Sequence, residues 1–137
     1  MNVIFICTAN SCRSQMAEAW AGRLFPSGWT VCSGGLLTYR ITDNTRRAMA
    51  EAGLDMEGQK TKTFDQFDLN SFDLVVTLSN EAGRYLPALA HPERHLRRPI
   101  TDPMSSDGSA EEVQAAFREG RERIKGIVED LVRDHST

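Results

Sequence analysis

The residues best suited to chemistry are Cys7 and Arg13, which bracket a short polar stretch. Residues 3–14 read VIFICTANSCRS, a pattern typical of a buried strand that runs into a tight loop and then directly into a helix. Such a loop collects unpaired backbone N–H groups and the positive end of the helix dipole, so it attracts tetrahedral oxyanions. A cysteine in that environment is favoured as the thiolate, which is a strong nucleophile. We therefore expect Cys7 to attack a bound oxyanion.

The context of this pair matters more than its spacing, because a cysteine six residues before an arginine arises easily by chance. The alternative is a buried structural cysteine beside a salt-bridging arginine, and the strand, polar loop and amphipathic helix argue against it. Arg13 presents a planar fork of donors that can grip two oxygens of a tetrahedral anion, which lysine cannot do. Asn10, in the middle of the loop, can adopt a left-handed conformation or tie the loop down with its side chain.

Length and composition limit the classes of protein that this chain can represent. Its 137 residues are enough for one domain, 1–137, and too few for two. The net charge of -3 argues against general nucleic-acid or membrane-surface binding. We find no run of transmembrane length and no signal-peptide pattern, and we expect a cytoplasmic monomer. Three cysteines form no disulfide framework and indicate reactive or buried thiols.

The pattern of apolar residues and helix boundaries predicts alternating strands and helices. We expect strands over residues 2–7, 29–32 and 72–78 and a weak edge strand within 91–100. Helices are expected over 14–24, from Asp43 or Asn44 to 52, over 80–86, and from a capping box made by Ser109 and Glu112. The fold class is therefore α/β, a three-layer sandwich around a four-stranded parallel sheet. Ser79 follows a strand at the carboxyl edge where the Cys7 loop lies.

Four motifs together resemble the low-molecular-weight protein tyrosine phosphatase superfamily, and within it the arsenate reductases. They are, in order, CTANSCRSQMAEAW at 7–20, SGG at 33–35, FDLVVTL at 72–78 and DP at 102–103. The resemblance implies that Cys7 is the nucleophile, that Ser14 hydrogen-bonds its thiolate, and that Asp102 is the general acid on a mobile loop. An ordinary Asp-Pro turn is the alternative for Asp102. The oxyanion would be held by Arg13 and by the loop amides of Thr8, Ala9, Asn10, Ser11 and Cys12.

The reaction depends on how many thiols the chain supplies. A phosphatase needs only water to break its phosphocysteine, whereas an arsenate reductase needs a second thiol to supply electrons and form a disulfide. Thioredoxin-coupled relatives carry two resolving cysteines where this chain has Ser79 and Leu86. The second thiol is then external, of the glutathione or mycothiol type with a glutaredoxin-like recycling protein, or internal. Cys12 and Cys32 are the internal candidates, and a small buried hydrophobe is the alternative for Cys32.

Met104, Ser105 and Ser106 stand where tyrosine phosphatases of this family carry tyrosines that cradle an aromatic substrate. We therefore predict an arsenate reductase with no tightly bound cofactor. The alternative is a low-molecular-weight tyrosine phosphatase that hydrolyses phosphomonoesters through a phosphocysteine intermediate. Phosphate and arsenate have nearly the same shape and charge, so the same site should bind both.

Ion binding is a separate question. Some arsenate reductases of this family bind potassium behind the loop, with residues corresponding to Asn10, Glu18 and Ser33 and an acid where this chain has Lys62. The Lys62 ammonium can replace the metal by pairing with Glu18, and a solvent-exposed lysine is the alternative. No transition-metal site is predicted, and His91 and His95 are expected to be solvated loop residues. Arg94, Arg97 and Arg98 form a basic cluster that either faces solvent or attracts a redox partner.

Overall fold

A parallel four-stranded sheet forms the centre of the computed structural model, which describes residues 1–136. The strands lie in the order β2-β1-β3-β4. Their bounds are Asn2–Cys7 for β1, Thr30–Gly35 for β2, Leu74–Thr77 for β3 and His95–Arg97 for β4. The helices are α1 (Arg13–Leu24), α2 (Asp43–Glu51), α3 (Asn80–Tyr85) and α4 (Ala110–His135). The predicted α/β class and the four-stranded parallel sheet are confirmed.

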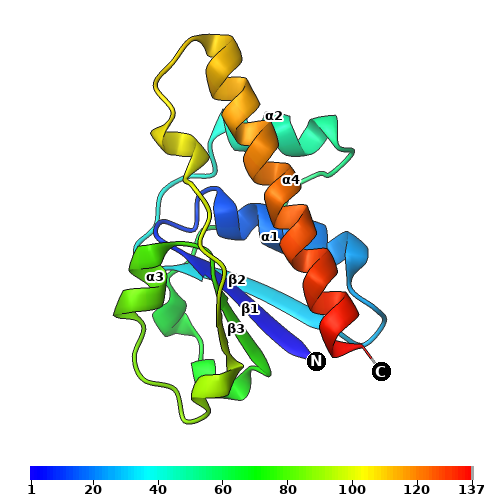
Figure 1. Cartoon of the computed structure of the whole chain (residues 1–137), viewed down its shortest axis with the longest axis vertical. Helices are drawn as coiled ribbons and strands as arrows, with labels where there is room; N and C mark the ends of the chain where they lie inside the picture. Colours follow the sequence, from blue (N-terminus) through cyan, green and yellow to red (C-terminus); the bar gives the residue numbers. More distant parts are fainter. Residues whose placement is uncertain (137) are drawn as a thin grey trace.

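Helices cover both faces of the sheet, which makes three layers (Figure 1). Helices α1 and α4 pack on one face, where Val3 and Phe5 of β1 meet Trp20 and Ile124. On the other face Ile4 and its neighbours meet α3 and the short 3-10 turns that precede β3. Because β1 is covered on both sides, its sequence is almost continuously apolar, as expected for the centre of a parallel sheet.

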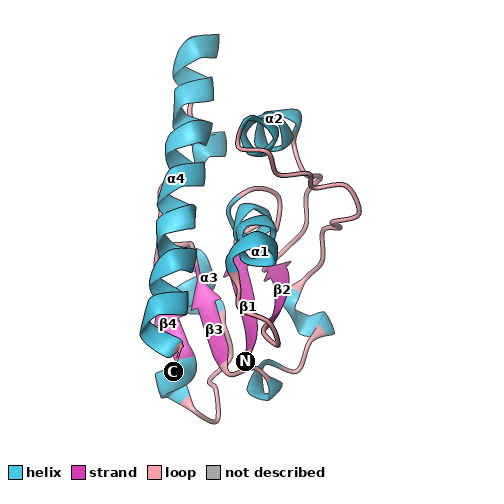
Figure 2. Cartoon of the chain, turned by 90° about the vertical axis from the view of Figure 1, so that its right-hand side faces the viewer, coloured by secondary structure: helices cyan, strands magenta, loops and turns pink. Residues whose placement is uncertain are grey.

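The parallel register brings the carboxyl ends of the strands together at one edge, as Figure 2 shows. Cys7 at the end of β1 lies beside Gly35 at the end of β2, and Ile6 lies beside Thr77 at the end of β3. The loops that leave these ends meet above the sheet. This edge is where parallel α/β proteins gather their ligand sites.

Several boundaries differ from the sequence-based expectation, among them those of β2, α2 and β3. Strand β2 continues to Gly35 instead of ending before Ser33, because Gly35 still pairs with Cys7 and its N–H donates to the carbonyl of Lys62. Helix α2 is capped by the hydroxyl of Thr42, which accepts from the N–H of Thr45, and neither Asp43 nor Asn44 is the cap. The strand at 72–78 is shorter, with β3 at Leu74–Thr77.

The long helix α4 crosses the molecule diagonally and packs on α1 and α2 (Figure 1). The predicted capping box is present, since the Ser109 hydroxyl accepts from the N–H of Glu112 and the Glu112 carboxylate accepts from the N–H of Ser109. Its buried stripe includes Phe117, Ile124 and Val128. Within residues 1–136 no helix combines the length and apolar character needed to cross a bilayer.

Candidate active site

The loop between β1 and α1 wraps around a small pocket of about 70 Å³. Asn10 fulfils both roles that were considered for it: its φ is 49°, in the left-handed region, and its side chain donates to Ser14 and Ser33. The loop also needs a residue without a side chain beneath it, because a Cβ on Gly35 would lie only 2.7 Å from the backbone nitrogen of Asn10. The pocket is lined by Cys7, Thr8, Ala9, Ser11, Cys12, Arg13, Asp102 and Met104.

Cys7 lines this pocket and is 2% exposed. Its Sγ is 2.9 Å from the Oγ of Ser14, in the first turn of α1. The Nδ2 of Asn10 donates to the same Ser14 oxygen over 2.8 Å. The sulfur of Cys7 and the hydroxyl of Ser14 are thus hydrogen-bonded to each other at the amino end of α1.

Arg13 begins α1 and reaches across the pocket to the loop that follows β4. Its Nη1 donates to the carbonyl of Ile100 at 3.0 Å, and its Nη2 lies 3.6 Å from the Oδ2 of Asp102. These contacts hold the guanidinium in place, and Arg13 is only 7% exposed. One small pocket thus brings together the thiol of Cys7, the planar guanidinium of Arg13 and the carboxyl group of Asp102.

Comparison with known proteins identifies the family to which this pocket belongs. The family model described as low molecular weight phosphotyrosine protein phosphatase matches residues 2–136. The chain belongs to this family. The chain is 38% identical over 122 residues to the arsenate reductase of Halalkalibacterium halodurans, covering 89% of this chain and 88% of that protein.

Solved structures of known proteins also resemble this chain. A structure described as an arsenate reductase in the phosphate binding state matches with a TM-score of 0.80 and 29% identity, covering 98% of both chains. A low molecular weight protein tyrosine phosphatase from T. tengcongensis matches with a TM-score of 0.80 and 21% identity, covering 98% of this chain and 99% of that chain, and shows likeness of fold alone. Within this family the chain is therefore placed with the arsenate reductases, as its motifs predicted.

The loop of this family member is tied to its neighbours by side chains at both ends. Thr8 donates from its Oγ1 to the Oγ of Ser79, at 3.0 Å, and Ser79 in turn caps α3 by accepting from the N–H of Ala82. Ser11 donates from its Oγ to the carbonyl of Arg40 over 2.6 Å. Asn10 does not line the pocket, because its buried side chain points away from it toward Ser14 and Ser33.

The two other cysteines lie in different environments. Cys12 precedes α1, lines the pocket and is 3% exposed, and burial raises the pKa of its thiol to about 12. Cys32 lies beside Ile4 in the sheet and packs against the apolar cluster on the face opposite Phe5 and Cys7. Burial, and then the nearby charge of Glu18, raise the pKa of Cys32. The sheet does not bring Cys32 to the sulfur of Cys7.

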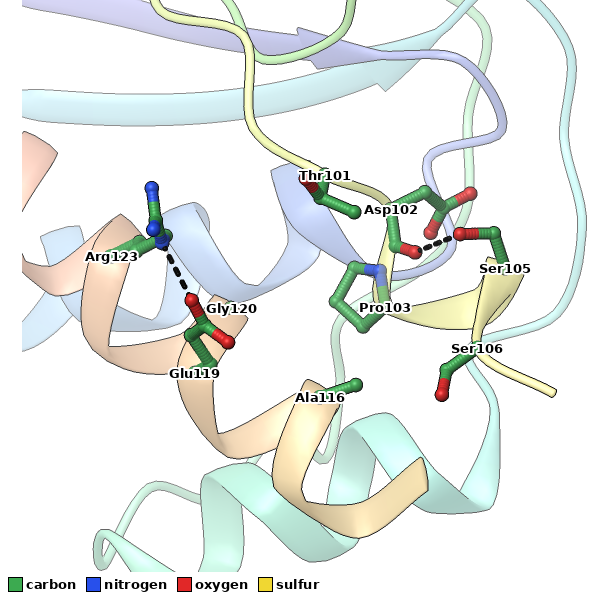
Figure 3. Close-up of a pocket in the computed structure, with 9 residues that line it drawn as sticks. All are labelled: Thr101, Asp102, Pro103, Ser105, Ser106, Ala116, Glu119, Gly120 and Arg123. Atoms are coloured by element: carbon green, nitrogen blue, oxygen red, sulfur yellow. Dashed lines mark hydrogen bonds and ion pairs between the residues drawn. The ribbon is translucent and has the colours of Figure 1, made fainter. Parts of the chain in front are cut away.

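Asp102 precedes and caps a 3-10 turn, Pro103–Ser105, and lines two pockets. Its Oδ1 accepts from the N–H of Met104 at 3.0 Å, and its carbonyl accepts from the hydroxyl of Ser105. Figure 3 shows the second pocket, of about 270 Å³, between this turn and Gly120 on α4. Asp102 therefore has the Cys7 pocket on one side and open space on the other.

The four residues of the predicted loop-supporting cluster come together behind the loop. Asn10 donates to Ser33 at 3.0 Å, Ser33 donates to the Oε1 of Glu18 at 2.7 Å, and the Nζ of Lys62 lies 3.7 Å from that same oxygen. A potassium ion does not fit this arrangement, because the Lys62 ammonium already lies against the only carboxylate of the cluster. Within residues 1–136 no group of three His, Cys, Asp or Glu side chains could hold a metal ion.

The basic cluster and the histidines differ in part from expectation. His95 is not a solvated loop residue: it belongs to β4, and its Nε2 lies 3.0 Å from the Oγ1 of Thr77. Burial, and then the charge of Arg97, lower the pKa of His95. Arg97 is also engaged, donating to the carbonyl of Gly83.

Two residues that support the site had no clear signal in the sequence. Gln15 is fully buried, and its Nε2 donates to the Oδ1 of Asn10 at 2.9 Å. Gly120 allows α4 to approach Pro103, because a Cβ there would lie 2.7 Å from the Cγ of Pro103. The only hint of the first support in the sequence is the position of Gln15, a polar residue directly after Ser14 at the start of the predicted helix.

Proposed function

We propose that this chain reduces arsenate to arsenite, with Cys7 as the nucleophile. The observation that carries the proposal is the shared pocket of Cys7, Arg13 and Asp102, whose volume of about 70 Å³ suits a free tetrahedral oxyanion. The likeness to an arsenate reductase in the phosphate binding state supports oxyanion binding at this loop. Arg13 and the loop N–H groups stabilise the charge that develops on the anion.

The first step joins the sulfur to arsenic. The Cys7 thiolate attacks the arsenic of arsenate, an S–As bond forms, and one As–O bond breaks. Asp102 acts as general acid and gives its proton to the departing oxygen, which leaves as water. Ser14 donates a hydrogen bond to the thiolate and so keeps it oriented toward the anion.

The second step transfers the electrons. A second thiolate attacks the Cys7 sulfur, so that an S–S bond forms and the S–As bond breaks. The electron pair of the S–As bond stays on arsenic, which passes from As(V) to As(III) and leaves as arsenite. A further thiol reduces the mixed disulfide by exchange and regenerates Cys7.

We infer that the second thiol is external, of the glutathione or mycothiol type, with recycling by a glutaredoxin-like protein. Ser79 and Leu86 supply no sulfur at the places where thioredoxin-coupled relatives carry theirs. The raised pKa of Cys12 and the position of Cys32 on the far face of the sheet weigh against an internal relay. Such a reaction belongs in the cytoplasm, where low-molecular-weight thiols are kept reduced.

The experiment follows arsenate-dependent NADPH oxidation with glutathione and glutaredoxin, with mycothiol and its glutaredoxin, and with thioredoxin. Hydrolysis of an aryl phosphate is measured beside it. We expect arsenate reduction with one of the low-molecular-weight thiols, its loss in Cys7→Ser, and its retention in Cys32→Ser. Aryl phosphate turnover with no arsenate reduction under any donor would instead establish the phosphatase reaction through a phosphocysteine, which the same Cys7, Arg13 and Asp102 can perform.

A further inference from the structure

A directional set of hydrogen bonds lies behind the Cys7 loop, and Asn10 decides its direction. The Oδ1 of Asn10 accepts from the backbone N–H of Lys62, at 2.8 Å, and from the Nε2 of Gln15, at 2.9 Å. Since two donors face this oxygen, the amide NH₂ of Asn10 must point the other way. Its two N–H groups reach the hydroxyl oxygens of Ser14 and Ser33.

Each serine then has a single proton left to give. Ser14 accepts from Asn10, so its own O–H is free to donate to the sulfur of Cys7, 2.9 Å away. By the same reasoning Ser33 donates to the Oε1 of Glu18, and the 2.7 Å distance is that of a hydrogen bond to a charged oxygen. Cys7 is thus the acceptor at one end of the set, and the Glu18 carboxylate is the acceptor at the other.

The carboxylate end requires a cation, because Glu18 is 19% exposed and accepts from a buried network. Lys62 supplies it. The Nζ of Lys62 lies 3.7 Å from Glu18 Oε1 and is held there by donating to the carbonyl of Lys60 at 2.7 Å. The backbone N–H of Lys62 meanwhile binds Asn10, so one residue engages both Glu18 and the amide that sets the direction of the network.

We propose that Lys62 is a positioning residue that stands in place of a metal cation behind the loop and keeps the Ser14 hydroxyl directed at Cys7. Its ammonium pairs with the Glu18 carboxylate, and Glu18 accepts the hydroxyl proton of Ser33. The oxygen of Ser33 then accepts one N–H of Asn10, and the second N–H of Asn10 is donated to Ser14. The proposal rests on Cys7 being the nucleophile of the proposed function, but it does not depend on which oxyanion is the substrate.

The test compares Lys62→Met with Lys62→Arg and with Lys60→Met, which removes the same charge from an exposed side chain two residues away and leaves the backbone carbonyl of Lys60 in place. The readout is the rate of iodoacetamide alkylation at Cys7 against pH, located by fragment mass spectrometry. We expect Lys62→Met to react about fivefold more slowly at neutral pH and to move the profile to higher pH, as for the loss of about one oriented hydrogen bond. Lys62→Arg and Lys60→Met should follow the unsubstituted chain.

A second measurement keeps the proposal falsifiable if Lys62→Met folds poorly. Thermal unfolding of the unsubstituted chain is followed in potassium chloride and in choline chloride of equal concentration. We expect no difference, because the ammonium occupies the place of the ion, whereas Lys62→Met should regain stability and Cys7 reactivity in potassium. Potassium stabilisation of the unsubstituted chain, or equal alkylation of Lys62→Met and Lys60→Met, would overturn the role of Lys62. Neither result would affect arsenate reduction as the proposed function, which is measured separately.

Discussion

The hydroxyl oxygen of Ser14 lies 2.9 Å from the sulfur of Cys7, although seven positions separate the two residues in the chain. The contact joins the first turn of α1 to the end of β1. Both residues are buried, and the Nδ2 of Asn10 donates to the same Ser14 oxygen. In the proposed reaction, this contact keeps the sulfur oriented toward the bound oxyanion.

Ser14→Ala is expected to slow the alkylation of Cys7 at neutral pH by about tenfold or more, because a hydrogen bond to a charged acceptor contributes roughly 1.5 to 3 kcal/mol. The measurement is the rate of iodoacetamide modification against pH. Ser11→Ala is the control, since that hydroxyl lies in the same loop but donates to the carbonyl of Arg40. Equal slowing in both variants would mean that Ser14 acts only through the shape of the loop.

Arg13→Lys tests whether the guanidinium grips the anion with two donors. Lysine keeps the charge but loses the fork, and it also loses the bond to the carbonyl of Ile100. We expect turnover to fall by about a hundredfold, the cost of one oxyanion donor. Phosphate should also protect Cys7 from alkylation only at much higher concentration than in the unsubstituted chain. Unchanged protection by phosphate would show that Arg13 does not contact the anion.

Gly120→Ala tests whether α4 positions the general acid. A Cβ at Gly120 would lie 2.7 Å from Pro103 Cγ, so the turn that carries Asp102 must shift. We expect turnover to fall by about tenfold to a hundredfold, as for a misplacement near 1 Å, while alkylation of Cys7 stays unchanged.

Gly126→Ala is the matched control on the same helix, because a Cβ there meets nothing within 4 Å. It should keep full turnover and gain about 1 kcal/mol of stability from the better helix propensity of alanine. If both glycine variants turn over at the normal rate, α4 does not position Asp102.

The buried thiol of Cys12 should make the free energy of unfolding depend on pH. Its pKa rises from 9.0 to about 12 on folding, so the unfolded chain loses this proton at a lower pH than the folded chain does. The free energy of unfolding should therefore fall as the pH rises above about 9 and should stop falling on this account near 12. Urea unfolding of Cys12→Ala across this range should give a shallower decline. An identical slope in the two proteins would contradict a buried, protonated Cys12.

Local patterns were enough to predict the central part of the site. The strand that ends at Cys7, the loop that follows it and the helix expected from Ser14, one residue after its observed start, follow from neighbouring residues, because backbone preferences and helix ends act over a few positions. The parallel sheet followed as well, since strands separated by helices pack with their carboxyl ends together. Boundaries such as the end of β2 were less predictable, because pairing with Cys7 extends that strand through two glycines.

By itself, therefore, the sequence determined the Cys7 loop, the α/β fold and the absence of the usual resolving cysteines at Ser79 and Leu86. Only the tertiary structure decided which distant segments pack around that loop. It placed Gly120 of α4 against Pro103, beside Asp102, and it separated Cys32 from Cys7 by turning their side chains to opposite faces. Such pairings depend on the packing of distant segments and on strand register, and neither leaves a periodic or local trace in the order of the residues.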